Sequence, residues 1–290
     1  MAAGLLAQTN GTPMTAYVRP ITGNTICYPL FGHPVAQVST PPTINRWFDD
    51  QAIDAVMFAL EVAPSAVDSF FRVLRTWQNC GGFSVTVPHK QAAFRTVDEL
   101  TGRAQRSGSV NIVRRMSDGR LIGDMTDGLA MNEALRRNGI KLEGQTVLLV
   151  GGGGGAGAAI SDALCAAGIS TLYLIEADQT RQDFVTAKLR QEYPAVDIRT
   201  ALPPDKKVGI AINATPLGMQ SHDPLPFDPA VVADAGIIAD VVTKPAETEL
   251  LRNAVQRGLK IQTGQDMANA QLEFQMRHLG LWPDDEDTSA

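Results

Sequence analysis

A run of glycines near the middle of the chain, 151–155 followed by Ala156 and Gly157, constrains the fold more than any other stretch. Four apolar residues, 147–150, precede it and suit a buried parallel strand, and an alanine-rich segment with good helix propensity follows it. Strand, glycine turn and helix in this order are typical of a dinucleotide-binding unit. A turn without side chains can approach a pyrophosphate closely, and free N–H groups at the start of the helix stabilise its negative charge.

Two overlapping frames of the fingerprint Gly-x-Gly-x-x-Gly/Ala fit this stretch, one beginning at Gly151 and the other at Gly152. The sequence does not decide which glycine takes which role. A tight turn that binds nothing is the alternative, and the strand before the turn and the helix after it favour the dinucleotide. The turn residues predicted to contact the cofactor are Gly151, Gly153, Gly154, Gly155 and Ala156.

The chain is predicted to have two α/β halves, because its 290 residues suggest about two domains. The second half alternates strands and helices regularly, which predicts a doubly wound parallel sheet with helices on both faces. Its strands are expected at 146–150, 171–175, 197–201, 209–213, 237–241 and 259–262, with a largely helical segment at 244–258 and a last helix at 266–278.

The first half carries apolar residues at both strand and helix spacing. Its strands are predicted at 25–31, 54–61 and 83–87, its helices at 43–51, at 66–77, after Pro88 and at 129–137, and a hairpin at 109–115 and 120–123. We expect an N-terminal α/β substrate domain, then a Rossmann-type dinucleotide domain, with the last helix returning to the first. The expected boundaries are a flexible leader at 1–20, a substrate-binding and catalytic domain at 21–126 with the helix 265–280, a dinucleotide domain at 127–264 and a disordered acidic tail at 281–290.

Charge and composition argue against several classes of protein. The net charge is -6, from 25 basic and 31 acidic residues without a basic run, so a nucleic-acid partner is not expected. No apolar stretch reaches the ~20 residues of a membrane-spanning helix, and no positive charge precedes Arg19, so neither a membrane partner nor a signal peptide is expected. Three widely spaced cysteines argue against a disulfide framework, and the four histidines show no metal-ligand spacing. A reduced cytoplasm is the expected compartment.

Seven segments in a fixed order carry a family resemblance. They are Gly32-His33-Pro34-Val35-Ala36 with Thr40-Pro41, Ser84-Val85-Thr86-Val87-Pro88-His89-Lys90, Gly108-Ser109-Val110-Asn111, Gly123-Asp124-Met125-Thr126-Asp127-Gly128, the glycine turn, Asn213-Ala214-Thr215-Pro216-Leu217-Gly218-Met219, and 264–271. In this order they resemble the shikimate and quinate dehydrogenase family over nearly everything from Thr25 to Gly280. The resemblance implies a reversible hydride transfer between a nicotinamide cofactor and a ring secondary alcohol of a cyclic polyhydroxy acid.

The resemblance implies that Lys90 and Asp127 form a catalytic pair beside the reacting hydroxyl. Without it, Lys90 would be interpreted as a solvated surface lysine and Asp127 as a helix N-cap. A lysine at its reference pKa near ~10.4 is a poor general base at neutral pH, and an adjacent carboxylate further favours the ammonium. We therefore assign proton transfer and substrate positioning to the pair jointly, without deciding which group holds the proton.

Further contacts follow from the same resemblance. Asn111 and Gln271 are expected to hydrogen-bond substrate hydroxyl groups, and Thr86 is expected in the substrate site. An amide at a turn or strand edge is the alternative for Asn111. The segment 213–219 is expected on the nicotinamide side, where a plain strand-to-loop exit is the alternative. The cofactor residues implied outside the glycine turn are Asn213, Thr215, Pro216, Leu217, Met219 and Gly264.

Departures from the family pattern concern the substrate. Members that take shikimate place two hydroxyl residues where this chain has Val38 and Thr40, so one hydroxyl is replaced by an apolar side chain. Ser39 is adjacent, but neighbouring side chains of an extended segment face opposite ways, so we expect that it does not substitute. Thr243 stands in place of the family's tyrosine, and Ser84 in place of a common asparagine. These changes predict weak or altered activity on shikimate.

Cofactor choice is predicted from Glu176, at the end of the strand 171–175 and about 25 residues after Gly151. Members that select the phosphorylated cofactor resemble Asn-Arg-Thr here, whereas this chain has Glu176-Ala177-Asp178. A carboxylate accepts hydrogen bonds from ribose hydroxyls and repels a 2′-phosphate, so NAD is favoured and NADP is the alternative. Arg181 and Lys188 are expected to be solvated helix charges rather than phosphate ligands.

The combined prediction is an NAD-preferring dehydrogenase of the shikimate/quinate type, working as a monomer or homodimer. Its expected partner is a small cyclic hydroxy acid. The alternatives are an aminoshikimate or other side-branch dehydrogenase, or a cofactor-binding regulator without turnover. The presence of both Lys90 and Asp127 argues against the regulator, because a binding module has no need of such a pair.

Overall fold

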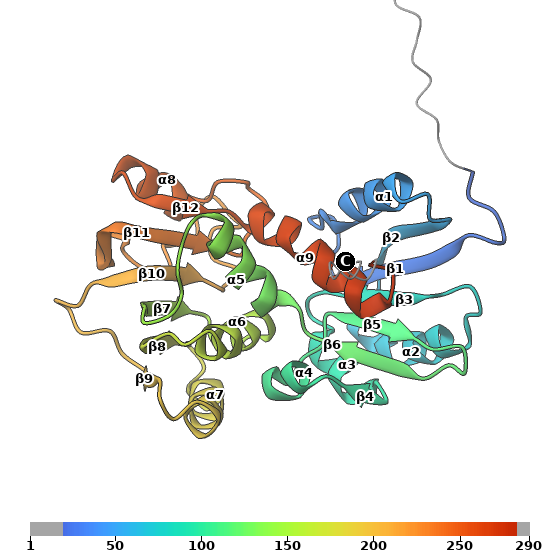
Figure 1. Cartoon of the computed structure of the whole chain (residues 1–290), viewed down its shortest axis with the longest axis horizontal. Coiled ribbons are helices and arrows are strands. Elements are labelled where there is room, and N and C mark those ends of the chain that lie inside the picture. The colour runs from blue at the N-terminus through green and yellow to red at the C-terminus, as the bar shows by residue number, and fades with distance from the viewer. Residues whose placement is uncertain (1–19, 283–290) are drawn as a thin grey trace, which may run out of the picture.

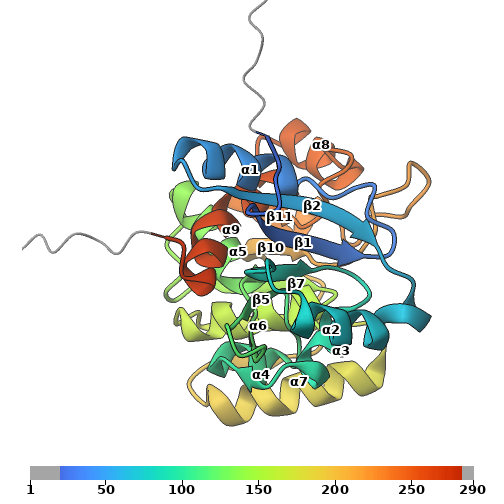
Figure 2. The same cartoon turned by 90° about the vertical axis from the view of Figure 1, so that its right-hand side faces the viewer.

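The computed structural model describes residues 20–282, so the predicted leader and tail lie almost entirely outside the described residues. Two six-stranded sheets lie side by side, each with helices packed on it, and the long helix near the C-terminus runs from one to the other (Figure 1). Figure 2, a view from the side of the first sheet, shows the second sheet behind it. No helix within the described residues is long and apolar enough to cross a membrane.

The first sheet has the strand order β2-β1-β3-β5-β6-β4. Strand β5 runs antiparallel to both of its neighbours, and the other pairings are parallel. The strands are β1 (Ile26–Gly32), β2 (Ala55–Glu61), β3 (Gly82–Val85), β4 (Glu99–Leu100), β5 (Ile112–Arg115) and β6 (Leu121–Asp124). The helices of this half are α1 (Thr40–Asp50), α2 (Val67–Thr76), α3 (Lys90–Thr96) and α4 (Gly102–Ser107).

The second sheet is parallel throughout, with the order β12-β11-β10-β7-β8-β9. Its strands are β7 (Thr146–Val150), β8 (Thr171–Ile175), β9 (Asp197–Arg199), β10 (Val208–Asn213), β11 (Val232–Asp240) and β12 (Lys260–Gln262). The helices are α5 (Asp127–Arg137), α6 (Gly155–Ala166), α7 (Gln179–Glu192), α8 (Glu249–Gln256) and α9 (Gly264–Leu279). The strand order reverses at β7, so the glycine turn that follows β7 lies at the switch point where doubly wound sheets bind ligands.

The two halves are joined by α5 and α9. Helix α5 begins directly after β6 of the first sheet and packs on α6 of the second half and on α9. Helix α9 begins after β12 of the second sheet and packs against α1 and β5 of the first (Figure 1). Gly128 permits the close approach of α5 and α6, because a Cβ atom there would overlap the carbonyl oxygen of Ala159. This contact fixes the start of α5 relative to the second half.

Several predicted elements are confirmed and several have different ends. Strands 146–150 and 171–175 match β7 and β8, and the predicted hairpin is the pair β5–β6. The helical segment predicted over 244–258 is wrong at its start, since α8 begins only at Glu249, where the Thr248 hydroxyl accepts a hydrogen bond from Leu251 N. Helix α1 begins three residues earlier than predicted, because Pro41 and Pro42 fit a first turn. The short elements β4 and α4 were not predicted.

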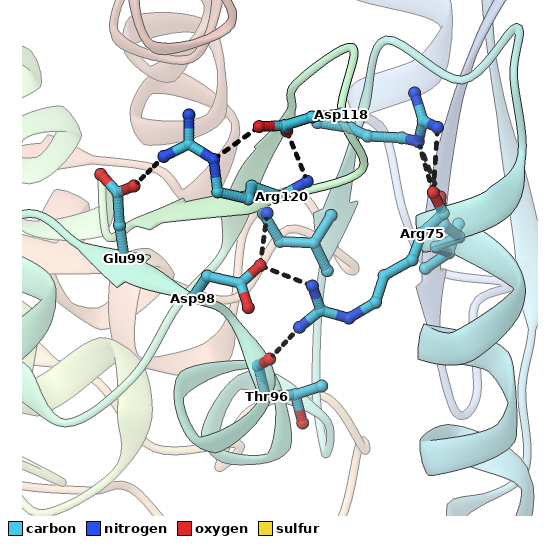
Figure 3. Close-up of polar contacts among 9 residues, drawn as sticks. Arg75, Thr96, Asp98, Glu99, Asp118 and Arg120 are labelled. Atoms are coloured by element: carbon cyan, nitrogen blue, oxygen red, sulfur yellow. Dashed lines mark hydrogen bonds and ion pairs between the residues drawn. The ribbon is translucent and has the colours of Figure 1, made fainter.

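A network of charged side chains joins the end of α2 to β4 and to the β5–β6 turn (Figure 3). Arg75 donates to Asp98 Oδ2 at 2.5 Å and to the Thr96 carbonyl at 2.6 Å, and Asp98 also accepts from the backbone of Leu121. The Arg75 hydrogen bond is the main cause that lowers the pKa of Asp98. Arg120 donates to both Asp118 and Glu99. The network stabilises the edge of the first sheet and lies apart from the residues predicted for the site.

Candidate active site

A cavity of about 240 Å³ lies between the two halves of the chain. The first half contributes residues from β1, β3, α3, the segment before α1 and the loop after β3. The second half contributes the start of α6, the segment after β11 and the face of α9. Of the predicted site residues, the cavity is lined by Val38, Thr40, Thr86, Lys90, Asn111, Asp127, Ala156, Thr243, Gly264 and Gln271.

Lys90 and Asp127 meet on the cavity wall. Lys90 is the first residue of α3 and Asp127 the first residue of α5, so both side chains are held by helix starts in different halves of the chain. Lys90 Nζ donates to Asp127 Oδ2 at 2.5 Å, and the two side chains are 14% and 6% exposed. The first helix residue Asp127 does not cap its own helix, since its carboxylate is turned toward Lys90. The structure therefore brings together the two residues predicted as a pair.

The second oxygen of the same carboxylate is held by two amides. Asn111 Nδ2 and Gln271 Nε2 each donate to Asp127 Oδ1 at 2.7 Å. Asn111 is itself fixed, because its Oδ1 accepts from the backbone N–H of Thr126 at 3.0 Å. Four groups from four separate parts of the chain thus converge, with one ammonium, one carboxylate and two amides. A carboxylate held by this many donors stays in one orientation while it positions Lys90.

The segment before α1 corrects one prediction. Ser39 has a helical backbone conformation as the N-cap of α1, and Thr40 is already helical, so this segment is not extended. Ser39, Thr40 and Val38 all line the cavity. Ser39 makes no capping hydrogen bond with its side chain. The premise of an extended segment was therefore wrong, because the two prolines after Thr40 fit a helix start, and the expectation that Ser39 does not substitute loses its geometric basis.

The glycine turn combines both frames that the sequence left open. Gly151 has a φ of 89°, which suits the first glycine of a tight turn, and α6 begins at Gly155 with Gly154 as its N-cap. A Cβ atom on Gly157 would overlap the carbonyl oxygen of Gly151, so Gly157 is the glycine that lets helix and strand approach. The tight turn at Gly151 is the first glycine of the frame that begins there, whereas the close approach at Gly157 is the last glycine of the frame that begins at Gly152. The turn is accordingly one residue longer than the fingerprint.

The turn lies against the catalytic pair. A Cβ atom on Gly155 would be 3.6 Å from Lys90 Cδ, and the Ser109 hydroxyl donates to the Gly155 carbonyl at 3.2 Å. The free N–H groups at the start of α6 therefore belong to the same region as Lys90. A ligand that reaches from this turn toward the cavity would pass Lys90 and Asp127. A Cβ atom on Gly151, Gly153 or Gly157 would overlap neighbouring atoms, so the turn has no side chains at these positions and presents its backbone.

Glu176 sits on the glycine turn from the end of β8. Its Oε2 accepts a hydrogen bond from Gly153 N at 2.8 Å, and its backbone N–H donates to Gln182 Oε1 at 3.0 Å. Arg181 is largely exposed and pairs with Asp178 at 3.4 Å. Lys188 donates to the carbonyl of Gln105 on α4 at 2.8 Å. The Glu176 carboxylate hydrogen-bonds the turn, whereas Arg181 approaches it with its aliphatic Cβ, which would lie 2.8 Å from a Cβ atom on Gly153.

The segment after β10 is organised by Asn213, which is fully buried. Its Nδ2 donates to the carbonyl of Leu217 and to Asp240, and its Oδ1 accepts from Thr215. Burial raises the pKa of Asp240, although its carboxylate also accepts from Thr248. Thr215 packs beside Gly151, where a Cβ atom would be 2.7 Å from Thr215 Cγ2. Asn213 thus shapes the loop, and the loop edge at Thr215 adjoins the glycine turn.

Three predicted residues of this segment do not line the cavity of the catalytic pair. Met219 is 39% exposed and lines a separate hollow with Pro224 and Leu225. Pro216 and Leu217 do not line the cavity that contains Lys90.

Cys27, Cys80 and Cys165 are free thiols, and burial raises the pKa of Cys80 to about 11 and that of Cys165 to about 12. Within residues 20–282 no group of three or more His, Cys, Asp or Glu is arranged to hold a metal ion.

Two residues on the cavity wall were missed as site residues. Ser84 was noted only as a departure from the family pattern, and Gln275 was not singled out; both are 3% exposed. Ser84 Oγ and Gln275 Oε1 are buried without a hydrogen-bond partner. The spacing of Gln275 four residues after Gln271 on a predicted helix was a usable signal, because residues i and i+4 share a helix face.

Comparisons with known proteins agree with this arrangement. Residues 30–113 match the family model of the shikimate dehydrogenase substrate binding domain. Shikimate dehydrogenase (NADP(+)) of Rubrobacter xylanophilus is 35% identical over 91% of this chain and 94% of its own length. The structure of shikimate 5-dehydrogenase from Thermus thermophilus with NADP(H) and shikimate has a TM-score of 0.78 at 28% identity, covering 90% of this chain and 95% of that one. The enzyme from Listeria monocytogenes with shikimate and NAD has a TM-score of 0.79 at 25% identity, covering 91% and 94%.

Proposed function

Since this chain belongs to the shikimate/quinate dehydrogenase family of oxidoreductases, we propose that it transfers hydride reversibly between NAD and a ring secondary alcohol of shikimate, quinate or a related cyclic polyhydroxy acid. The observation that carries the proposal is the Lys90–Asp127 pair, buried on the wall of a cavity that the glycine turn adjoins. A dinucleotide fits the turn because backbone N–H groups and a helix start face outward there without side chains. When bound, it supplies the nicotinamide that accepts the hydride.

The pair supplies the proton chemistry. As the ring C–H bond breaks and its electron pair leaves as hydride, the hydroxyl O–H bond also breaks and a ketone forms. The proton passes to the Lys90–Asp127 pair, and in the reverse direction the pair returns it to the carbonyl oxygen. Asn111 and Gln271 act as positioning residues, because their amides orient the carboxylate that holds Lys90. Burial of both side chains keeps water from competing for these hydrogen bonds.

The start of α1 is the proposed site for the substrate carboxylate. Ser39 and Thr40, two hydroxyl-bearing residues, line the cavity, and Val38 beside them belongs to one apolar cluster with Leu272. One hydroxyl position of the family's shikimate site is thus filled by an apolar group, and Thr243 carries a shorter side chain than the family's tyrosine. These differences favour a second candidate, a side-branch dehydrogenase for aminoshikimate or another altered ring acid.

A substrate panel tests the proposal and separates the two candidates. Initial rates with shikimate, quinate and aminoshikimate, each with NAD and NADP, are expected to show turnover of at least one ring acid and weak turnover of shikimate. Efficient shikimate turnover at micromolar concentration would contradict the altered site inferred from Val38 and Thr243. Binding of NAD without turnover of any ring acid would leave a cofactor-binding regulator instead.

Glu176 is the basis for the proposed preference for NAD. Its carboxylate contacts the glycine turn, where it can accept hydrogen bonds from ribose hydroxyls and repel a 2′-phosphate. The curated relatives bear NADP(+) in their names, so this preference would distinguish the chain from them. Replacing Glu176 with glutamine keeps one oxygen that can accept from Gly153 N, removes the charge and turns the other oxygen into an NH2 donor.

The Glu176→Gln variant should lower the Michaelis constant for NADP about 10-fold, because ~1.4 kcal/mol of repulsion is removed, and should change that for NAD about threefold or less. Steady-state rates with each cofactor at saturating substrate give both constants. Glu192→Gln, which removes the same charge at the far end of α7, is the matched control and should alter neither constant. An unchanged ratio in Glu176→Gln would remove the carboxylate from cofactor selection.

A further inference from the structure

The inner wall of the cavity carries two polar atoms that are not satisfied by the protein. Among residues 20–282, Ser84 Oγ and Gln275 Oε1 are both buried without a hydrogen-bond partner, and each residue is 3% exposed. Both side chains line the cavity that contains Lys90 and Asp127. A buried polar group without a partner is costly, so native proteins rarely keep one unless a ligand, ion or water satisfies it. Two such groups on one wall point to a polar group of the ligand.

The two residues come from two different elements, a strand and a helix. Ser84 lies on β3, paired with Leu30 of β1 and Ile112 of β5. Gln275 lies on α9, one turn beyond Gln271, which is about 6 Å along the helix axis. Gln271 donates to Asp127, whereas Gln275 lies one turn farther along the same helix and its amide oxygen has no partner among residues 20–282. Gln275 and Ser84 therefore offer hydrogen bonds to a substituent other than the reacting hydroxyl.

The start of α1 lies next to this part of α9. Helices α1 and α9 pack together, and Val38 belongs to one apolar cluster with Leu272 and Met276, the latter adjacent to Gln275. Ser39 and Thr40 line the same cavity. The site proposed above for the substrate carboxylate thus adjoins the part of α9 that carries Gln275, and Ser84 lines the same cavity. A substrate group that reaches Ser84 and Gln275 would be attached at, or beside, the ring carbon that carries the carboxylate.

Resting on the proposed function, we propose that Ser84 and Gln275 form a specificity subsite for a hydroxyl on the carboxylate-bearing ring carbon. Such a hydroxyl donates to Gln275 Oε1 and accepts from the Ser84 hydroxyl, which satisfies both atoms. A planar, unsaturated carbon at that position carries no hydroxyl and leaves both atoms unpaired. The subsite therefore selects a saturated ring acid of the quinate kind over an unsaturated one of the shikimate kind.

Ligand binding to the enzyme saturated with NADH tests this subsite without any turnover, because neither the reduced cofactor nor the alcohol can react further. Titration calorimetry should give a dissociation constant for quinate about 10-fold or more below that for shikimate. Gln275→Leu should raise the quinate constant about 10-fold and change the shikimate constant about threefold or less. Ser84→Ala should act in the same direction, and its smaller side-chain change guards against a loss of folding in the first variant.

Gln256→Leu makes the same chemical change at an exposed position of α8 and should leave both constants unaltered. The subsite is overturned if wild-type protein binds the two acids equally, binds neither, or if Gln275→Leu weakens both by the same factor. Hydride transfer to NAD is measured separately. Tighter binding of quinate without any turnover would refute the proposed reaction and support the subsite. Turnover without tighter binding of quinate would support the reaction and refute the subsite.

Discussion

Replacing Lys90 with methionine should lower kcat for ring-alcohol oxidation by about 10³-fold, while the dissociation constant for NADH stays within about twofold of wild type. Methionine keeps much of the apolar stem and removes the only ammonium that contacts Asp127 among the described residues. The reacting hydroxyl then loses one member of the pair that takes its proton. Single-turnover absorbance at saturating substrate measures the chemical step, and quenching of protein fluorescence by NADH measures binding.

The exposed Lys141 provides the matched control for this variant. It pairs with Glu143 at the surface, and Lys141→Met should change neither rate nor binding. A second variant, Lys90→Arg, keeps the positive charge with a much higher pKa, so it should retain substrate binding and lose most of the rate. Unchanged turnover in Lys90→Met would exclude Lys90 from the mechanism. Loss of NADH binding together with rate would indicate a structural role instead.

Replacing Gly157 with alanine should weaken NADH binding about 100-fold or more and lower the melting temperature by several degrees. The added Cβ would overlap the carbonyl of Gly151 and approach Gly152 Cα, and backbone atoms cannot move aside as a side chain can. The turn must open, which displaces the N–H groups that face the pyrophosphate. Calorimetric unfolding and NADH titration measure the two effects on the same preparation.

The Gly154→Ala variant distinguishes a steric clash within the folded protein from a steric clash with the bound cofactor. A Cβ atom on Gly154 would be 3.6 Å from the nearest atom, which is an ordinary contact, so the variant should keep the wild-type melting temperature. Its methyl group stands on the outward side of the turn, so NADH binding is expected to weaken. If Gly157→Ala bound NADH as tightly as wild type, the close approach of Gly157 to the Gly151 carbonyl would have no role in cofactor binding.

Much of the fold was predictable because the hydrophobic pattern and the turn residues indicate the same elements. Strands β7 and β8 are short apolar runs between clear turn signals, and their ends were predicted to the residue. The start of α8 was not, because Pro245 and the capping hydroxyl of Thr248 move it beyond the apolar pattern. The short β4 and α4 have too few residues for a period to be recognised.

The site was predictable where a family motif names a residue and less so where local geometry decides. Lys90 and Asp127 come from motifs 37 residues apart, and the structure places their side chains in contact. The orientation of Ser39 depends on where α1 begins, which the sequence pattern placed three residues too late. Gln275 carries no motif, and its importance depends on a tertiary fact, the lack of any partner for its amide oxygen.

The crossing of α9 from one half to the other limits how this chain can exchange parts with its relatives. A chimera that takes its dinucleotide half from another protein needs two junctions, one between β6 and α5 and one between β12 and α9. The second junction falls at Gly264, on the cavity wall, and the helix beyond it carries Gln271 and Gln275. Cofactor specificity can therefore be transplanted as a module only if α9 is inherited with the N-terminal half.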